Sequence, residues 1–121
     1  MPSMRGYFTL KDLPAEKVTD TISRRMLVGE KEMVVWWSMK AGAHAAAHRH
    51  PHEQIFWIVS GRMDFRLGDE KRSCGAGDLG VIPPNVEHEA WFPVDTEVVD
   101  IFAPPREDFL TATPPAYMTQ G

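Results

Sequence analysis

The sequence predicts an all-β protein, on two observations about its pattern. Short apolar runs separated by Gly, Pro, Asn and Asp recur about every eight to twelve residues, a spacing typical of sandwiches and barrels. Helical periodicity is scarce along the same stretch. About eight to ten strands fit this pattern, and a closed barrel or a double-sheet jelly-roll would cover their edges. We therefore expect a single domain over residues 1–121.

The first half of the chain contains three expected strands, at residues 19–28, 33–39 and 54–60. The second of them holds Trp36 and Trp37 next to β-branched residues, a composition with strong strand preference. The third is apolar from Ile55 to Val59 and has no polar face. We expect both faces of this strand to be buried.

The second half predicts more strands and then a helical turn. Residues 62–67 alternate strictly between apolar and polar side chains, which indicates one buried face and one wet face. Shorter strands are expected at 72–74, 79–82, 87–92 and 97–102. After Pro105, residues 106–110 predict at most one helical turn. Residues 1–6 and 111–121 are expected to be loose tails.

Composition and charge narrow the class of protein. The chain carries 17 acidic and 13 basic side chains and no Lys/Arg-rich stripe, so nucleic-acid binding, which needs phosphate-neutralising cations, is not expected. No window approaches the ~18 uncharged apolar residues of a membrane span, and residues 1–10 lack the apolar core of a secretory signal. A lone cysteine, Cys74, excludes an intrachain disulfide. We expect a cytoplasmic protein that binds neither membranes nor nucleic acid.

The histidines are the feature most relevant to function, because four of the five lie between His44 and His52. In a strand, residues two apart project to one face, so His48 and His50 can point toward one metal. If extended backbone continues past Pro51, Gln54 shares their parity and Glu53 points away. Gln54 is therefore the preferred third ligand. His88, the histidine outside the cluster, is the candidate fourth.

Each of these residues also has a structural interpretation. A His-x-His pair by itself is as compatible with incidental surface as with a metal. His44 lies in an Ala-rich stretch and is interpreted as loop surface. His52 fits equally well a contact to a ligand or substrate and a place on the surface of a turn.

The spacing of these residues resembles the two motifs of the cupin superfamily. The first motif is matched by Gly42, His48, His50, Gln54 and Gly61, with glutamine in place of the usual acid. The second is matched by Gly77, Pro83 and His88, with Asn85 in place of a glycine and Phe92 in place of an asparagine. Asparagine tolerates the left-handed backbone that a glycine position requires.

The resemblance implies a small cupin barrel, a double-stranded β-helix or jelly-roll, that binds a divalent metal through His48, His50, Gln54 and His88. A neutral glutamine leaves the metal its full positive charge, which favours Lewis-acid chemistry over oxygen chemistry. The ligand set suits Zn, Ni, Mn or Fe(II).

The last strand supplies candidates for catalysis. Alternation puts Asp100 and Phe102 on one face, opposite Val99 and Ile101. A carboxylate inside the barrel is a candidate general acid or base, or else a structural group that bonds a loop. Arg106 follows two prolines and can clamp an anion with its planar fork, or else pair at the surface with neighbouring acids.

This segment, with the first metal motif, resembles the pectin-degradation cupins of the KdgF type, which open the ring of 4,5-unsaturated uronates to linear keto sugars. The resemblance implies that the metal polarises sugar oxygens, Arg106 holds the carboxylate, Asp100 moves a proton and Phe102 packs on the ring. Two other interpretations stay open. The chain is a different cupin lyase, isomerase or dioxygenase, or a sugar-binding module without catalysis.

The apolar side chains also suggest a partner. The strand at Ile55 to Val59 and the tryptophans Trp36, Trp37, Trp57 and Trp91 exceed what one small barrel easily encloses. A homodimer formed face to face between sheets is the expected remedy, because exposed apolar patches usually mark interfaces.

Overall fold

The computed structural model describes residues 3–111 and 116–119. Its strands, in chain order, are β1 (Glu16–Lys17), β2 (Ile22–Val28), β3 (Met33–Met39), β4 (His44–His48), β5 (Glu53–Ser60), β6 (Arg62–Leu67), β7 (Glu70–Gly75), β8 (Leu79–Ile82), β9 (His88–Trp91) and β10 (Thr96–Ala103). The expected all-β class is confirmed. β3, β6 and β8 have the predicted bounds, whereas β4 lies in a segment interpreted as loop.

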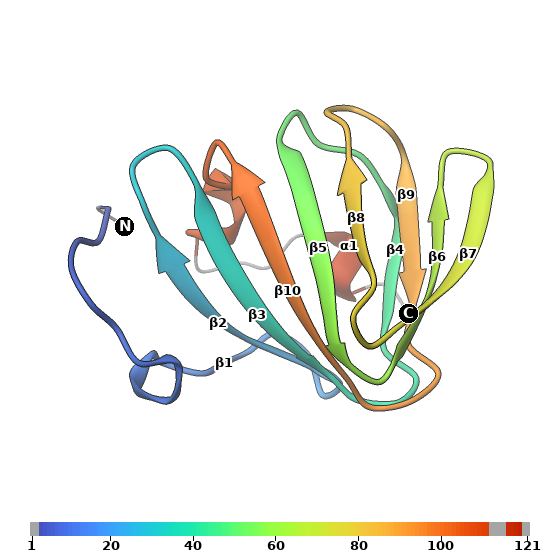
Figure 1. Cartoon of the computed structure of the whole chain (residues 1–121), viewed down its shortest axis with the longest axis horizontal. Coiled ribbons are helices and arrows are strands. Elements are labelled where there is room, and N and C mark those ends of the chain that lie inside the picture. Colours follow the sequence, from blue (N-terminus) through green and yellow to red (C-terminus); the bar gives the residue numbers. More distant parts are fainter. Residues whose placement is uncertain (1–2, 112–115, 120–121) are drawn as a thin grey trace.

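Two antiparallel sheets face each other, as Figure 1 shows. The larger has the order β1-β2-β3-β10-β5-β8, and the smaller has the order β4-β9-β6-β7. Strands distant in sequence are therefore neighbours, because the last strand, β10, pairs with both β3 and β5. This is the double-sheet jelly-roll expected from the sequence, and its interior lies between the sheets.

Alternation along β3 and β10 builds the interior wall of the larger sheet. Met33, Val35, Trp37 and Met39 are buried, and the residues between them are less so. The register pairs Asp100 with Val35, so the β10 carboxylate enters the same interior as these apolar side chains. The two-residue alternation of side chains along β10 thus places the Asp100 carboxylate beside the apolar side chains that β3 directs into the interior.

Two turns depend on left-handed backbone. Gly61 has φ of 88°, and a Cβ there would overlap the Asp95 carbonyl oxygen and the Thr96 side chain. Asn85 has φ of 64°, and its N–H donates to the His50 carbonyl oxygen at 2.8 Å. Asn85 thus holds the turn before β9 against the segment that carries His50, as its role in place of a motif glycine predicts.

The expectation that both faces of β5 are buried is wrong for the single chain. Gln54, Phe56 and Ile58 face the interior, but Ile55 is 37% exposed and Trp57 is 46% exposed on the other side. No second layer covers the outer face of this strand in the part of the chain that the structure describes. An apolar strand with two similar faces does not reveal whether another molecule covers one of them.

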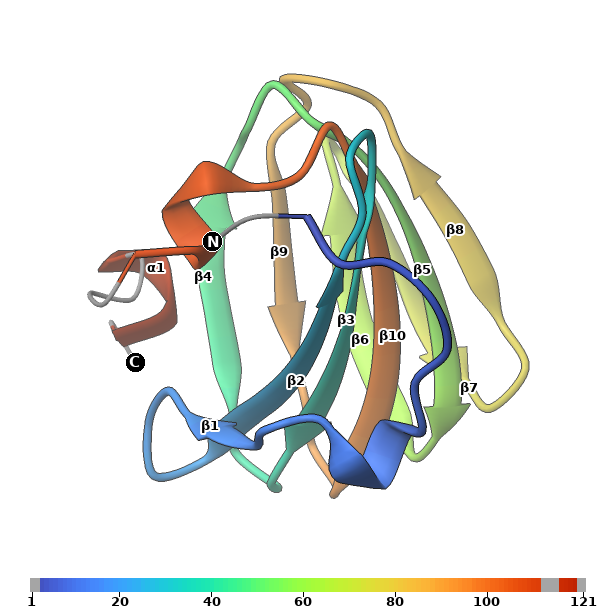
Figure 2. The same ribbon diagram turned by 90° about the vertical axis from the view of Figure 1, so that its left-hand side faces the viewer.

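Three short helical segments complete the described chain: η1 (Leu10–Asp12), η2 (Glu107–Phe109) and α1 (Ala116–Thr119). η2 is the predicted turn, formed as a 3-10 helix. Parts of both expected loose tails contact the body of the protein, because Met4 N–H donates to Val28 O and Met118 of α1 is buried. Figure 2 shows α1 beside β4. No helix among the described residues is long and apolar enough to cross a membrane.

Candidate metal centre and adjoining pocket

Three imidazoles from two strands and a connection meet inside the barrel. His48 ends β4, His88 begins β9, and His50 lies between β4 and β5. His48 pairs with His88 in the strand register, which brings the two cupin motifs together. One ring nitrogen from each histidine lies within 4.8 Å of the others. Such a group of three nitrogens can hold a metal ion.

The same contact orients each ring. His48 Nδ1 lies 2.7 Å from the Ala46 carbonyl oxygen, His50 Nδ1 lies 3.1 Å from that of His52, and His88 Nδ1 lies 2.9 Å from that of Val86. A carbonyl oxygen only accepts, so Nδ1 carries the proton and donates. Each Nε2 is left with a lone pair. This is the arrangement by which backbone partners orient metal-binding histidines.

The electrostatics keep these lone pairs available. Burial lowers the pKa of His48 to about 3 and that of His50 to about 4, and it also lowers the pKa of His88. Cationic Arg106 acts in the same direction on all three. The imidazoles are therefore neutral near pH 7, which is the form that binds a metal.

Gln54 completes the group. Its Oε1 lies 3.0 Å from His50 Nε2, and Glu53, its neighbour, is exposed as predicted. Near neutral pH both atoms present lone pairs, so they repel unless a cation lies between them. The amide N–H of Gln54 is hydrogen-bonded to the Asp100 carboxylate. The neutral amide of Gln54 can present its oxygen to His50 and its N–H to Asp100, whereas a second carboxylate at this position would repel Asp100.

These atoms fit a divalent metal. His88 Nε2 is fully buried and has no hydrogen-bond partner among the described residues. A buried acceptor without a partner is costly unless something binds it, and a metal ion at the meeting point of the Nε2 atoms would do so. Imidazole and amide ligands suit Zn, Ni, Mn or Fe(II), and nothing in the arrangement selects one of them.

Asp100 lies at the bottom of the adjoining pocket. The residue is 9% exposed, and its side chain projects from β10 into the interior together with that of Phe102. Burial raises the pKa of Asp100 to about 6, although contacts with Gln54, Trp37 and Arg106 act in the opposite direction. A carboxyl group in this state exchanges its proton close to neutral pH.

Arg106 is buried beside the pocket rather than at the surface, with 2% of the residue exposed. Its guanidinium group lies 4.0 Å from the centre of the Phe109 ring and 5.1 Å from that of Phe102. Nε and Nη2 donate to the two carboxylate oxygens of Asp108. Arg106 is thus paired with an acid, as one interpretation expected, and still lines the pocket. Nη1 forms no ion pair with the described residues.

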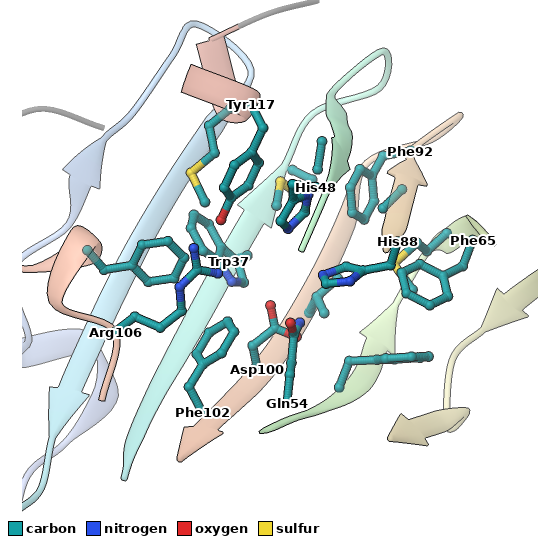
Figure 3. Close-up of a pocket in the computed structure, with 18 residues that line it drawn as sticks. Trp37, His48, Gln54, Phe65, His88, Phe92, Asp100, Phe102, Arg106 and Tyr117 are labelled. Atoms are coloured by element: carbon teal, nitrogen blue, oxygen red, sulfur yellow. The ribbon is translucent and has the colours of Figure 1, made fainter. Parts of the chain in front are cut away.

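Figure 3 shows these side chains around one cavity. Several of its lining residues were not predicted as site residues from the sequence, among them Trp37, Phe109, Tyr117 and Met118. The alternation of β3 contained the signal for Trp37, because it shares parity with buried Met33, Val35 and Met39. Nothing comparable marks Tyr117, which follows the last strand in a segment without periodicity.

The other two histidines lie outside the group of three. His44 belongs to β4, where its Nε2 lies 2.6 Å from Glu89 Oε2 and its ring stacks on Trp91, so the interpretation as loop surface is wrong. His52 touches the group through its backbone, because its carbonyl oxygen accepts from His50. The ring nitrogen Nδ1 of His52 is buried without a partner among the described residues.

Comparison with known proteins agrees with this fold. The profile described as "Cupin domain" matches residues 35–102. That match spans more than half of the chain and includes every proposed metal ligand, and the chain belongs to the cupin family.

Individual relatives and solved structures show which cupins the chain is similar to. The chain is 31% identical over 110 residues to the pectin degradation protein KdgF of Dickeya dadantii (strain 3937), a match covering 88% of this chain and 100% of the relative. Among solved structures, an RmlC-like cupin from Shewanella frigidimarina NCIMB 400 superposes with a TM-score of 0.86 and 28% identity, covering 90% of this chain and 99% of the other. KdgF from Halomonas sp. superposes with a TM-score of 0.81 and 29% identity, covering 88% and 99%.

Proposed function

We propose that this chain is a metal-dependent cupin enzyme that converts 4,5-unsaturated uronates, the products of pectin or alginate lyases, to linear keto sugars. The observation that carries the proposal is a pocket lined by His48, His88, Gln54, Asp100 and Arg106. His50 completes the group of three imidazoles beside it. The likeness to KdgF proteins over 88% of the chain supports the choice of substrate.

The proposed reaction is an isomerisation. A ring C–O bond breaks, a proton leaves a sugar hydroxyl, and a proton is added at the carbon–carbon double bond. No electrons are gained or lost, so no redox partner is needed. A divalent metal held by His48, His50, Gln54 and His88 would supply Lewis-acid polarisation of the sugar oxygens.

The pocket's own side chains have distinct parts in this proposal. Arg106 binds the uronate carboxylate, which its cationic group attracts locally despite the net charge of −4 on the whole chain. Asp100 takes and returns the proton, because its pKa of about 6 suits both directions near neutral pH. Phe102 packs against the sugar ring and helps to exclude water.

A direct assay tests the proposal. Purified metal-loaded protein is mixed with an unsaturated monouronate, and loss of the conjugated enol-ether absorbance is followed. We expect a rate well above the spontaneous one, and Asp100→Asn should remove it while metal content is retained. A rate equal to the spontaneous one would sink the assignment.

The expected homodimer has a structural basis in the outer face of the larger sheet. The strand registers place eight uncharged side chains in two rows across β3, β10, β5 and β8. The rows are Trp36, Val99, Trp57, Leu79 and Val34, Ile101, Ile55, Val81. Leu79 is 67% exposed and Val81 is 55% exposed. Two acidic chains can meet there without like-charge repulsion, which supports a second copy as the partner. The cytoplasmic location stays a prediction.

A further inference from the structure

The pocket is too small for the ligand that its polar groups suggest. Its cavity volume is about 60 Å³, among residues that include His48, His88, Asp100 and Arg106. Protein pockets that bind small molecules measure roughly 300–1,000 Å³, and a space of this size holds only a few waters. A sugar ring cannot enter unless one wall of the cavity moves.

One of the metal-binding atoms is closed off as well. His88 Nε2 is buried so fully that solvent does not reach it. An ion that binds this atom must also pass a wall that opens. A metal ion that reaches His88 Nε2 and a sugar acid that reaches the pocket therefore both need part of the cavity wall to move.

Most of the wall is fixed by the sheets. Trp37, Asp100 and Phe102 lie on strands whose ladders would break if they withdrew. α1 is different, because it has only four residues, and in the described part of the chain no backbone hydrogen bond joins it to either sheet. A helix this short has little stability of its own and depends on its side-chain contacts.

Those contacts are concentrated in Tyr117. Its ring lies flat on the His48 imidazole, with 3.6 Å between the ring centres and 4° between the planes. The Arg106 guanidinium lies 5.6 Å from the centre of the same ring, and Met118 beside it is 7% exposed. Figure 3 shows Tyr117 extending into the pocket between His48 and Arg106. A flat six-membered ligand that touches both of those groups needs this space.

We propose that Tyr117 is an internal plug: its ring occupies the ligand's place between His48 and Arg106, and α1 withdraws when a metal ion or a sugar acid enters. Residue 117 is thereby a specificity-determining position, since a ligand must replace the contacts that Tyr117 makes. The part that concerns the sugar acid rests on the proposed function. The part that concerns the metal ion does not.

Zinc uptake by the metal-free protein tests the plug without any substrate. Stopped-flow mixing with Zn²⁺ and a chromophoric chelator gives the association rate for wild type, Tyr117→Ala, Tyr117→Phe and Tyr7→Ala. A plug that leaves about one molecule in ten open slows uptake about tenfold, so Tyr117→Ala should be about tenfold faster. Tyr117→Phe keeps the stacked ring and loses only the hydroxyl's contact with Arg106, so its uptake should stay close to that of wild type and well below that of Tyr117→Ala. Tyr7, fully exposed, is the matched control and should also match.

A chain shortened to end at Thr111 provides the second variant and should take up zinc as fast as Tyr117→Ala. With an unsaturated monouronate as probe, both variants should show a KM about tenfold below wild type. Unchanged or slower zinc uptake would overturn the proposal, and so would a shortened chain that fails to fold, because α1 would then belong to the fold. Faster zinc uptake with no turnover in any variant would leave the plug standing and refute the uronate activity.

Discussion

His48, His50 and His88 are held by backbone carbonyl oxygens two residues away, and this contact sets which nitrogen carries the lone pair. The same device recurs on a strand end, a connection and a strand start. Gln54 then joins His50 to Asp100 with one side chain, its oxygen facing the imidazole and its N–H facing the carboxylate. At the residue scale, the three imidazoles and Gln54 present lone pairs that can bind one cation, and Asp100 beside them can hold a proton.

Removing one imidazole should therefore abolish tight metal binding. We expect His88→Ala to lower Zn²⁺ affinity by at least about 100-fold, because partners outside the metal's direct ligands already account for 10–100-fold. The matched control is His44→Ala, which removes a histidine that pairs with Glu89 outside the group. Elemental analysis after dialysis against a weak chelator gives the comparison. Equal metal content in the two variants would contradict the proposed ligand set.

Asp100 makes stability depend on pH in a defined direction. Its pKa is about 6 in the folded chain, above the ordinary value of 3.8 for an aspartate, so the folded state favours the protonated form. The penalty for burying the charge therefore grows as pH rises from about 4 to about 6. Asp100→Asn avoids that penalty and should gain on the order of 3 kcal/mol relative to wild type at pH 7.

Urea unfolding of both metal-free proteins at pH 4 and pH 7 measures this difference. The histidines are common to the two proteins and cancel in the comparison. A stability difference that is the same at both pH values would show that the Asp100 carboxyl titrates normally in the folded chain.

At the scale of elements, η2 is held in place by a buried cation from β2. Arg24 is 5% exposed, and its Nη2 donates to the Phe109 carbonyl oxygen at 3.1 Å while its Nε donates to Glu16. The Phe109 ring lies between two guanidinium groups, with Arg24 at 5.0 Å and Arg106 at 4.0 Å. Arg24 thereby positions the segment that presents Arg106 to the pocket.

Removing the contact between Arg24 and η2 should weaken substrate binding and leave metal affinity unchanged. We expect Arg24→Leu to raise the KM for an unsaturated monouronate about tenfold, the effect of losing one buried hydrogen bond to a charged group. Zinc affinity should stay unchanged, because no proposed ligand lies on β2 or η2. Arg25→Leu is the contrasting variant, since Arg25 donates to carbonyls of the N-terminal segment instead. Equal loss of zinc affinity and substrate binding would indicate general unfolding rather than positioning.

The elements also show what sequence alone can predict. β3 and β8 are predicted to the residue because β-branched and aromatic runs end at clear turn signals. β4 is missed because His-Ala-Ala-Ala-His contains residues with weak strand preference, and pairing with β9 imposes the strand. The metal group is predicted from spacing, since two-residue parity survives the connection at His50. Tyr117 leaves no trace in spacing, because its contact with His48 depends on tertiary packing alone.

At the scale of the whole molecule, the outer face of the larger sheet is apolar and is left uncovered by a single copy of the chain. Sequence reasoning predicted that β5 would be covered on both sides, and a single copy covers one. Burying Trp57, Leu79 and their neighbours against a second copy would reconcile the pattern with the structure. The interface would be isologous, with the same rows on each partner.

Sedimentation at micromolar concentration tests this arrangement. Wild type should sediment as a dimer, and Trp57→Asp should sediment as a monomer, because it places a charge inside the apolar face of each partner. The matched control is Val94→Asp, which alters another exposed apolar residue, 46% exposed, in the turn between β9 and β10. A monomeric wild type, or a Trp57→Asp variant that stays dimeric, would exclude this face as the interface.

The carbonyl oxygens that orient the three imidazoles have a consequence for redesign of this protein. Ala46, His52 and Val86 supply them from the main chain, so changing those side chains does not remove the acceptors. An engineer can therefore vary much of the apolar lining, in search of other substrates, while the imidazoles keep their orientation. The barrel provides a scaffold on which ligand geometry and substrate choice can be altered separately.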